Sequence, residues 1–462
     1  MFELPILTET INDETVEIPL LHTIPERKLY VETYGCQMNV NDSEIVMGVM
    51  NKSGYSITNK PDDADVILLN TCAVRDNAEK KIHERLDHLK YYKKRNRDLV
   101  VGVLGCMAER LRGDLLEKKL VDVVVGPDEY RSVPELINRA FKGEKGIAVK
   151  LSRVETYDDI LPLRTDGISA WVSIMRGCDK FCTFCVVPFT RGRERSRALG
   201  SVVDELKILW DCGFKETTLL GQNVNSYQDE QSSNDFADLL AMCARAVPNM
   251  RIRYTTSHPQ DMSDKLIETQ AEFENICNYI HLPVQSGSNR ILKLMNRTYT
   301  IEHYLERISK IRELIPTCAI STDIIVGFPT ETEEDNTATM ELMRTVQYNG
   351  AYMYNYSPRE KTKAWKMGDD VPNEVKTERL SRIIEQQRII SGELNQLTIG
   401  TTEKVLVEGA SKKNLTEWQG RTDSNKIVIF PHNEHGGYIV GDVISVKIHR
   451  ANSATLFGDI VE

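Results

Sequence analysis

The sequence contains no long apolar run, and this excludes a helix that spans a membrane. Such a helix needs about 20 consecutive, mostly apolar residues, and no segment of the 462 residues provides them. The first 25 residues contain acidic side chains and no continuous apolar core, so we expect no signal peptide. These absences favour a cytoplasmic protein with no membrane partner.

Cysteine is also sparse, and the balance of charge is acidic. Ten cysteines in 462 residues are too few for a disulfide scaffold. Clustered cysteines in a reducing compartment indicate metal ligands or catalytic thiols. The net charge of −10 argues against a general nucleic-acid binder, but it does not exclude a local basic surface.

The chain length suggests about three domains, and the first covers residues 28–143. Four short β-rich runs, "KLYVETYG", "ADVILLNT", "LVVGVLG" and "VDVVVG", alternate there with helical stretches. This alternation predicts a parallel α/β sheet. The polar residues 144–166 are interpreted as a linker.

A second α/β series occupies residues 165–396. Its six predicted strands are "AWVSIM", "TTLLG", "RIRYTT", "YIHLPV", "AISTDIIVG" and "AYMYNY". Six strand–helix units are too few for a closed eight-stranded barrel, so we expect a partial (β/α)6 barrel. Its active face is expected at the carboxyl ends of the strands.

Residues 399–462 have a different pattern. Short strands separated by turn residues, with little helical signal, predict a small antiparallel β-barrel of the oligonucleotide-binding kind. The complete prediction is therefore an α/β protein with three different domains.

Three cysteines, Cys178, Cys182 and Cys185, follow the first strand of the second series. Their C-x3-C-x2-C spacing allows one loop to present three thiolates to an iron–sulfur cluster. Three ligands leave one iron open, as substrate chemistry requires. A zinc site completed by a distant residue is the alternative.

Another three cysteines lie in the first domain. Cys36, Cys72 and Cys106 each come shortly after a predicted strand and just before a helix. In a parallel sheet all three would lie at the carboxyl edge, where helix N-termini favour thiolates. They indicate a second cluster with an open iron. Single buried packing residues are the alternative.

The cysteine pattern resembles the signature of the radical S-adenosylmethionine (SAM) enzymes. Two trios in two domains resemble the methylthiotransferases of that group, over about residues 28–462, with a carboxy-terminal barrel like the TRAM domain. Five sequence motifs are similar to those of the MiaB-type tRNA methylthiotransferases: "GCDKFCTFCVVPFTRGRERSR", "LLGQNVNSY", "TTSHP", "HLPVQSGS" and "STDIIVGFP".

This resemblance implies two 4Fe–4S clusters, SAM and a two-part reaction. One SAM methylates a sulfur on the amino-terminal cluster, and a second gives the radical that takes hydrogen from carbon 2 of an isopentenyl-adenosine beside the tRNA anticodon. Flavodoxin or ferredoxin is the implied electron donor, and a monomer is expected. The alternatives are a related enzyme acting on threonylcarbamoyl-adenosine in tRNA or on a ribosomal-protein aspartate, and a zinc-dependent nucleic-acid-binding module.

Further site residues are predicted from their positions. Candidate SAM contacts lie at or near strand ends, and each could equally cap a strand or turn: Gly221, Gln222, Ser257, Gln285 and Asp323. Candidate RNA contacts lie in a locally basic loop and in the last domain: Arg191, Arg193, Arg195, Arg197, Trp418 and Arg421. Four cysteines are interpreted as packing residues: Cys212, Cys243, Cys277 and Cys318.

Overall fold

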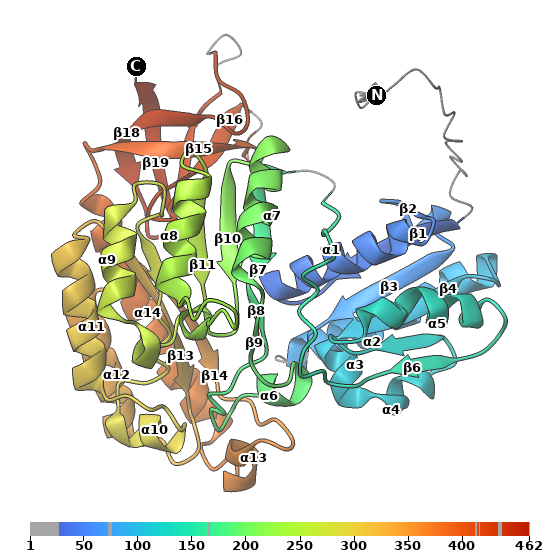
Figure 1. Ribbon diagram of the computed structural model, residues 1–462. Coiled ribbons are helices and arrows are strands. Elements are labelled where there is room, and N and C mark those ends of the chain that lie inside the picture. Colours follow the sequence, from blue (N-terminus) through green and yellow to red (C-terminus); the bar gives the residue numbers. More distant parts are fainter. Residues whose placement is uncertain are drawn as a thin grey trace.

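The computed structural model describes residues 27–72, 76–164, 167–411, 414, 416–432 and 437–461. Figure 1 shows the amino-terminal sheet domain beside a central strand–helix domain, with a small barrel at one end of the latter. The three predicted domain types are confirmed.

A six-stranded, all-parallel sheet forms the first domain, in the order β2-β1-β3-β4-β5-β6. The strands are β1 (Arg27–Thr33), β2 (Tyr55–Ile57), β3 (Val66–Thr71), β4 (Val100–Gly105), β5 (Val123–Val125) and β6 (Gly146–Ala148). The four predicted strands are β1, β3, β4 and β5. The two edge strands were not predicted, because three residues are too few to show a periodic pattern.

Edge strand β6 lies in the segment interpreted as a linker, so that interpretation is wrong for its first part. The segment then packs on the domain: Tyr157 is 2 % exposed, and the Leu163 backbone N–H donates to the Glu44 carbonyl at 2.9 Å. The sequence hides this because most of its burial comes from isolated side chains rather than from a periodic run.

Helices cover both faces of this sheet. Side chains of α1 (Gln37–Lys52) and α5 (Val133–Ala140) fill the core on one face. The other face is covered by α2 (Asp76–Arg95), α3 (Cys106–Leu111) and α4 (Gly113–Leu116). Burial on both faces explains why β4 is apolar throughout and β3 is apolar up to its last two residues, Asn70 and Thr71.

Six parallel strands in two neighbouring sheets, β11-β10-β7 and β12-β13-β14, form the central partial barrel. The strands are β7 (Ser169–Ser173), β10 (Glu216–Leu220), β11 (Arg251–Thr255), β12 (Tyr279–His281), β13 (Ala319–Val326) and β14 (Gly350–Asn355). They are the six predicted strands, and β7 and β14 lie at the outer edges. A short antiparallel pair, β8 (Met175–Arg176) and β9 (Arg195–Ser196), follows β7.

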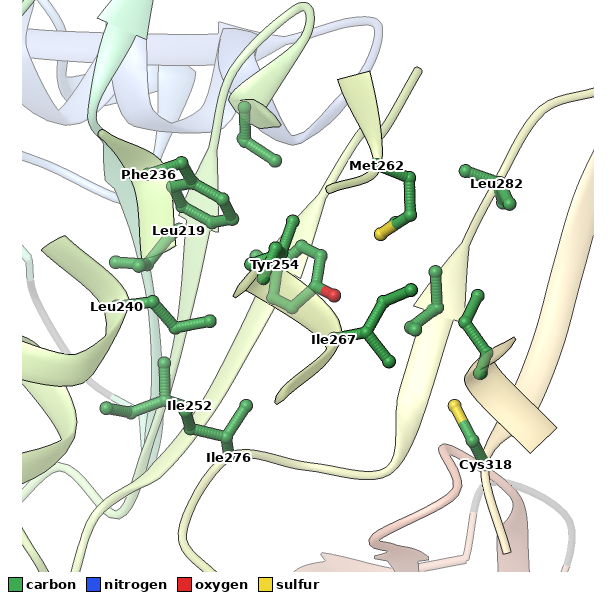
Figure 2. Close-up of a cluster of buried hydrophobic side chains, with 14 of the residues drawn as sticks. Leu219, Phe236, Leu240, Ile252, Tyr254, Met262, Ile267, Ile276, Leu282 and Cys318 are labelled. Carbon is green, nitrogen blue, oxygen red and sulfur yellow. The ribbon is translucent and has the colours of Figure 1, made fainter. Parts of the chain in front are cut away.

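Helices connect these strands and enclose one apolar core. They are α6 (Val187–Thr190), α7 (Leu199–Asp211), α8 (Phe236–Ala246), α9 (Asp264–Glu272), α10 (Asn289–Leu294), α11 (Ile301–Leu314), α12 (Glu333–Val346), α13 (Lys363–Met367) and α14 (Asn373–Gln396). Figure 2 shows part of this core, where side chains such as Phe236, Tyr254 and Ile267 lie between strands and helices.

Five strands close the carboxy-terminal barrel in the order β15-β16-β17-β19-β18. They are β15 (Thr402–Ala410), β16 (Glu417–Thr422), β17 (Ile427–Pro431), β18 (Val443–Ala451) and β19 (Thr455–Val461). The prediction of a purely antiparallel barrel is wrong at one pair, because β17 and β19 run parallel.

This barrel is fixed to the amino-terminal ends of the central strands. The Arg251 guanidinium, at the start of β11, donates to the Arg421 carbonyl at 2.9 Å. The Arg253 guanidinium, two residues later, donates to the carbonyls of Thr422 and Asp423 at 2.8 Å each. The Asn278 backbone N–H, just before β12, donates to the Asp423 carboxylate at 2.9 Å. The small barrel therefore lies at the end of the central domain opposite the carboxyl ends of its strands (Figure 1).

Among the described helices, none is both long and apolar enough to cross a membrane.

Candidate iron–sulfur and SAM site

The first cysteine trio lies in the loop between β8 and α6, at the carboxyl end of the barrel. Gly177 begins the loop with φ of +78°, and a Cβ there would lie 2.0 Å from the Arg193 carbonyl oxygen, so only glycine fits. The Cys185 backbone N–H donates to the Cys182 carbonyl at 3.0 Å. The three thiols interact electrostatically with one another, as ligands of one metal cluster must.

These cysteines are partly buried. Burial raises the pKa of Cys178 to about 11 and the pKa of Cys185 to about 12. Arg297 lies beside the trio, and its Nη1 donates to the Cys182 sulfur at 3.4 Å. Sequence reasoning missed Arg297, which is far from the cysteines along the chain and stands in no recognised motif.

The second trio lies at the carboxyl edge of the amino-terminal sheet. Cys36 is the residue before α1, Cys72 follows β3, and Cys106 begins α3. A Cβ built on Gly35 would lie 2.8 Å from the Cβ of Cys72. The residue before Cys36 is therefore next to Cys72, and the ends of β1 and β3 lie close together. Cys36 and Cys106 interact electrostatically, and burial raises the pKa of Cys106.

Arg191 comes from the other domain and contacts this trio. Its charge interacts with Cys36 and Cys106, and its Nη1 is buried without a hydrogen-bond partner among the described residues. An unpaired buried donor is costly. A thiolate-ligated anionic cluster beside it would accept that hydrogen bond, so the residues present fit such a group.

The two trios are close to each other because α3 packs against α6. One helix starts at Cys106, and the other starts two residues after Cys185. Within the described parts of the chain, however, no three His, Cys, Asp or Glu side chains are arranged to hold a metal ion. The cysteines therefore remain predicted ligands, supported by their convergence.

Three of the residues predicted to contact SAM lie just after the carboxyl ends of β10 and β11. A Cβ on Gly221 would meet the Met175 side chain at 2.6 Å, so a larger residue would displace that methionine. Gln222 and Ser257 follow β10 and β11, and Gln222 Oε1 and Ser257 Oγ are buried with no partner in the described structure. Buried, unsatisfied polar atoms need a partner, and a polar ligand here would supply one.

The other two predicted SAM contacts are placed differently. Gln285 has φ of +74°, and its backbone N–H donates to the Asp323 carbonyl of β13 at 2.9 Å. Asp323 lies in the middle of β13 rather than at its end, with Oδ1 3.6 Å from the His281 Nε2. Their roles stay predictions.

The structure corrects the predicted RNA-contacting loop. Arg191, Arg195 and Arg197 are at most 6 % exposed. They pair with Asp42 at 2.7 Å, Asp128 at 2.8 Å and Glu205 at 2.7 Å. These arginines were assigned to phosphate because the sequence does not show which distant carboxylates fold against them.

Other predicted RNA contacts have partners within the protein. Arg193 is exposed and pairs with Asp179 at 2.6 Å. Trp418 stacks on His432 with ring centroids 4.6 Å apart and packs on the barrel core. Arg421 pairs with Glu408 at 2.8 Å. Trp418 and Arg421 lie at the end of the molecule opposite the cysteines, and their roles stay predictions.

The remaining cysteines are mostly core residues, as predicted. Cys243, Cys277 and Cys318 are buried, and burial raises the pKa of each to about 12. Cys318 lies at the edge of the core in Figure 2. Cys212 is exposed at the carboxyl end of α7, so the packing interpretation is wrong for it.

Comparison with known families agrees with this three-part architecture. Residues 28–126 match the uncharacterized protein family UPF0004, residues 172–343 match the radical SAM superfamily, and residues 396–461 match the TRAM domain. The radical SAM methyltransferase TsrM from Kitasatospora setae is a structural relative, with a TM-score of 0.58, 14 % identity, and coverage of 73 % of this chain and 77 % of that one. At this identity the likeness concerns the fold alone.

Fold and cysteine loop thus define a radical SAM protein, a class that uses a 4Fe–4S cluster and SAM. The tRNA-2-methylthio-N(6)-dimethylallyladenosine synthase of Chloroherpeton thalassium is 53 % identical over 449 residues, which are 97 % of this chain and 99 % of that protein. The synthase of Parabacteroides distasonis is 53 % identical over 442 residues, 95 % and 96 % of the two chains. The chain belongs to the family of tRNA-2-methylthio-N(6)-dimethylallyladenosine synthases.

Proposed function

We propose that this protein inserts a methylthio group at carbon 2 of isopentenyl-adenosine (N6-dimethylallyladenosine) next to the tRNA anticodon. The carrying observation is the packing of α3 on α6, which brings the two cysteine trios of different domains to one place. Relatives at 53 % identity over nearly the whole chain bear the name of this synthase. An electron donor such as flavodoxin or ferredoxin and a monomeric state belong to the proposal.

Each domain has a proposed task. Residues 28–143, extended by β6, hold the auxiliary 4Fe–4S cluster on Cys36, Cys72 and Cys106. Residues 165–396 hold the SAM-binding 4Fe–4S cluster on Cys178, Cys182 and Cys185. Residues 399–462 bind RNA. The bound clusters and SAM supply methyl transfer to sulfur and radical hydrogen abstraction from the base.

The protein's own residues orient and shield these groups. Arg297 donates a hydrogen bond to the Cys182 sulfur, and Arg191 presents a buried donor to the other trio. Lys180, two residues after Cys178, donates to Asp261 at 2.8 Å, and Asn223 donates to the same carboxylate at 2.6 Å. These contacts hold the cysteine loop over the ends of β10 and β11, where Gln222 and Ser257 offer unpaired oxygens to SAM.

An anaerobic assay with defined RNA tests the proposal. Anticodon stem-loops carrying isopentenyl-adenosine, threonylcarbamoyl-adenosine or plain adenosine would be incubated with protein, SAM and reductant. Mass spectrometry of the nucleosides should find the methylthio product from the first RNA only. Product from the second RNA alone, or modification of a ribosomal-protein aspartate instead, would overturn the assignment.

A further inference from the structure

A basic and aromatic surface lies next to the first cysteine trio, on a segment with no role so far. Residues 357–368, "SPREKTKAWKMG", follow the last barrel strand. They contain four cations, Arg359, Lys361, Lys363 and Lys366, and one acid, Glu360. In a chain with a net charge of −10, this segment has a local excess of three positive charges.

The segment is anchored on the cysteine loop. The Ala364 backbone N–H donates to the Thr183 carbonyl at 2.9 Å, and Thr183 lies directly after Cys182. Ala364 also shares an apolar cluster with Phe184, the residue before Cys185. Thr362 caps α13 by accepting from the Trp365 N–H at 3.2 Å. The position of α13 is therefore tied to that of the cysteine loop.

Buried and exposed side chains alternate along the segment. Thr362 and Ala364 are at most 1 % exposed and form the anchor. Arg359 is also buried, at 8 % exposed, whereas the three lysines are exposed and Trp365 is 47 % exposed. We call five of the exposed residues the α13 patch: Lys361, Lys363, Trp365, Lys366 and Met367.

The charges of the α13 patch are not neutralised within the protein. In the described part of the chain, no ion pair or hydrogen bond engages the ammonium groups of Lys361, Lys363 or Lys366. Glu360, directly before Lys361, is the one exposed acid within the segment, and the two acids that follow it have other partners. Asp369 pairs with Lys376, and Asp370 accepts from the Thr330 N–H at 2.8 Å.

We propose that the α13 patch binds a single-stranded segment of the RNA substrate, the lysines contacting phosphates and Trp365 stacking on a base. Grooves that hold single strands combine such cations with exposed aromatic rings. The α13 helix and α6 lie at the same end of the central domain, opposite the small barrel (Figure 1). This inference rests on the proposed function, because the α13 patch would hold the RNA so that the reacting base lies near the cysteines.

Binding measurements test the α13 patch. The triple variant Lys361→Gln/Lys363→Gln/Lys366→Gln should bind the isopentenylated stem-loop more weakly, measured by fluorescence anisotropy from about 50 to about 200 mM salt. The slope of log affinity against log salt should become shallower by about 2, since each phosphate contact on a single strand contributes about 0.7. Trp365→Ala should lose about ten-fold in affinity with the slope unchanged.

A matched control removes the same charge elsewhere. Lys52, Lys119 and Lys142 are exposed and lie before β2, β5 and β6, at the edge of the first sheet that is opposite the cysteines. Replacing these three by Gln should leave both affinity and slope unchanged. SAM cleavage driven by a chemical reductant without RNA should stay at the wild-type rate in every variant, which shows that each is folded.

Several outcomes would overturn the inference. One is wild-type RNA affinity in the triple variant. Another is unchanged RNA affinity combined with slower reduction by an acidic flavodoxin, which would make the patch a protein-docking site. Ultraviolet cross-linking of wild-type protein to RNA should label the peptide containing Trp365, and cross-links confined to other peptides would contradict the proposal. A wild-type protein that binds through the patch but forms no methylthio product would instead overturn the proposed function.

Discussion

Arg191 Nη2 donates to Asp42 Oδ2 at 2.7 Å, and this contact joins the two domains that carry the cysteines. Arg191 follows the loop of Cys185, and Asp42 lies on the helix that follows Cys36. Arg176 donates to the other oxygen of Asp42 at 2.9 Å. Although burial alone would raise the pKa of Asp42, Arg176 and Arg191 hold it below its usual value.

Replacing Asp42 by Asn should destabilise the protein strongly. Two buried guanidinium groups would lose their counter-charge, which costs about 3–5 kcal/mol. Urea unfolding followed by circular dichroism measures the change. The control is Asp62→Asn, which breaks an exposed pair with Arg95 at 3.0 Å and should cost less than about 1 kcal/mol. An equal loss of unfolding free energy in the two variants would show that the interdomain pair stabilises the protein no more than an exposed ion pair does.

Two cysteine substitutions should divide the reaction. Cys182→Ala should abolish SAM cleavage, because the radical-generating cluster loses a ligand. Cys72→Ala should keep some SAM cleavage but stop methylthio insertion. Anaerobic wild-type protein should carry about eight irons with two 4Fe–4S clusters, and each variant should lose roughly half.

The matched control for these variants is Cys243→Ala, in the core of the central domain. It should keep the full iron content. If Cys182→Ala and Cys72→Ala both cleave SAM at the normal rate, the assignment of the two sites is wrong.

Ser257→Ala should weaken SAM binding without destabilising the fold. Its hydroxyl is buried and has no hydrogen-bond partner among the described residues, so its removal should leave the free energy of unfolding unchanged or higher. If the hydroxyl contacts SAM, the KM for SAM should rise by up to about ten-fold, as expected for one lost hydrogen bond.

Ser288→Ala provides the opposite pattern. Ser288 Oγ donates to Asp335 at 2.6 Å and caps α10. Its loss should cost about 1 kcal/mol of stability and leave the KM for SAM unchanged. The same KM in Ser257→Ala and wild type would remove Ser257 from the site.

Glu44 should make stability depend on pH near neutrality. Burial raises its pKa to about 7, and the charge of Arg164, 3.0 Å away, opposes the shift only in part. A carboxyl whose pKa is higher in the folded than in the unfolded chain holds its proton better when folded. Its contribution to stability is therefore fully present below the ordinary value near 4.5 and is lost as pH rises through about 7.

Urea unfolding at several pH values would compare wild type with Glu44→Gln. The difference in unfolding free energy, wild type minus variant, should fall by roughly 3 kcal/mol between about pH 4.5 and pH 8. The neighbouring Glu205 should behave in the opposite way. Although burial opposes it, Arg197 and Arg164 lower the pKa of Glu205, so its contribution is lost as pH falls. A difference independent of pH would show that Glu44 is ionised throughout.

Much of the fold was predictable because long helices and strands have a periodic pattern of apolar residues. Six barrel strands, four strands of the first sheet and the short-strand character of the last domain were predicted from apolar runs and turn residues. The three-residue strands β2 and β6 were not, because so few residues show no pattern. The parallel β17–β19 pair was missed because pairing direction depends on where the chain returns in space.

The candidate site was predictable to a different degree for each residue type. Cysteines at C-x3-C-x2-C spacing signal their chemistry locally, and strand ends predicted where the other trio would meet. Arginine gives no such signal, since Arg191 and Arg195 resemble phosphate contacts until Asp42 and Asp128 are placed beside them.

The sequence alone determined the three domain types and which six cysteines carry the proposed chemistry, because these follow from periodicity and spacing along the chain. Only the tertiary structure decided how the two trios meet, which arginines are buried between domains, and which lysines of the α13 patch are exposed. Ion pairing and exposure depend on residues far apart in the chain, and no local pattern records which of them become neighbours.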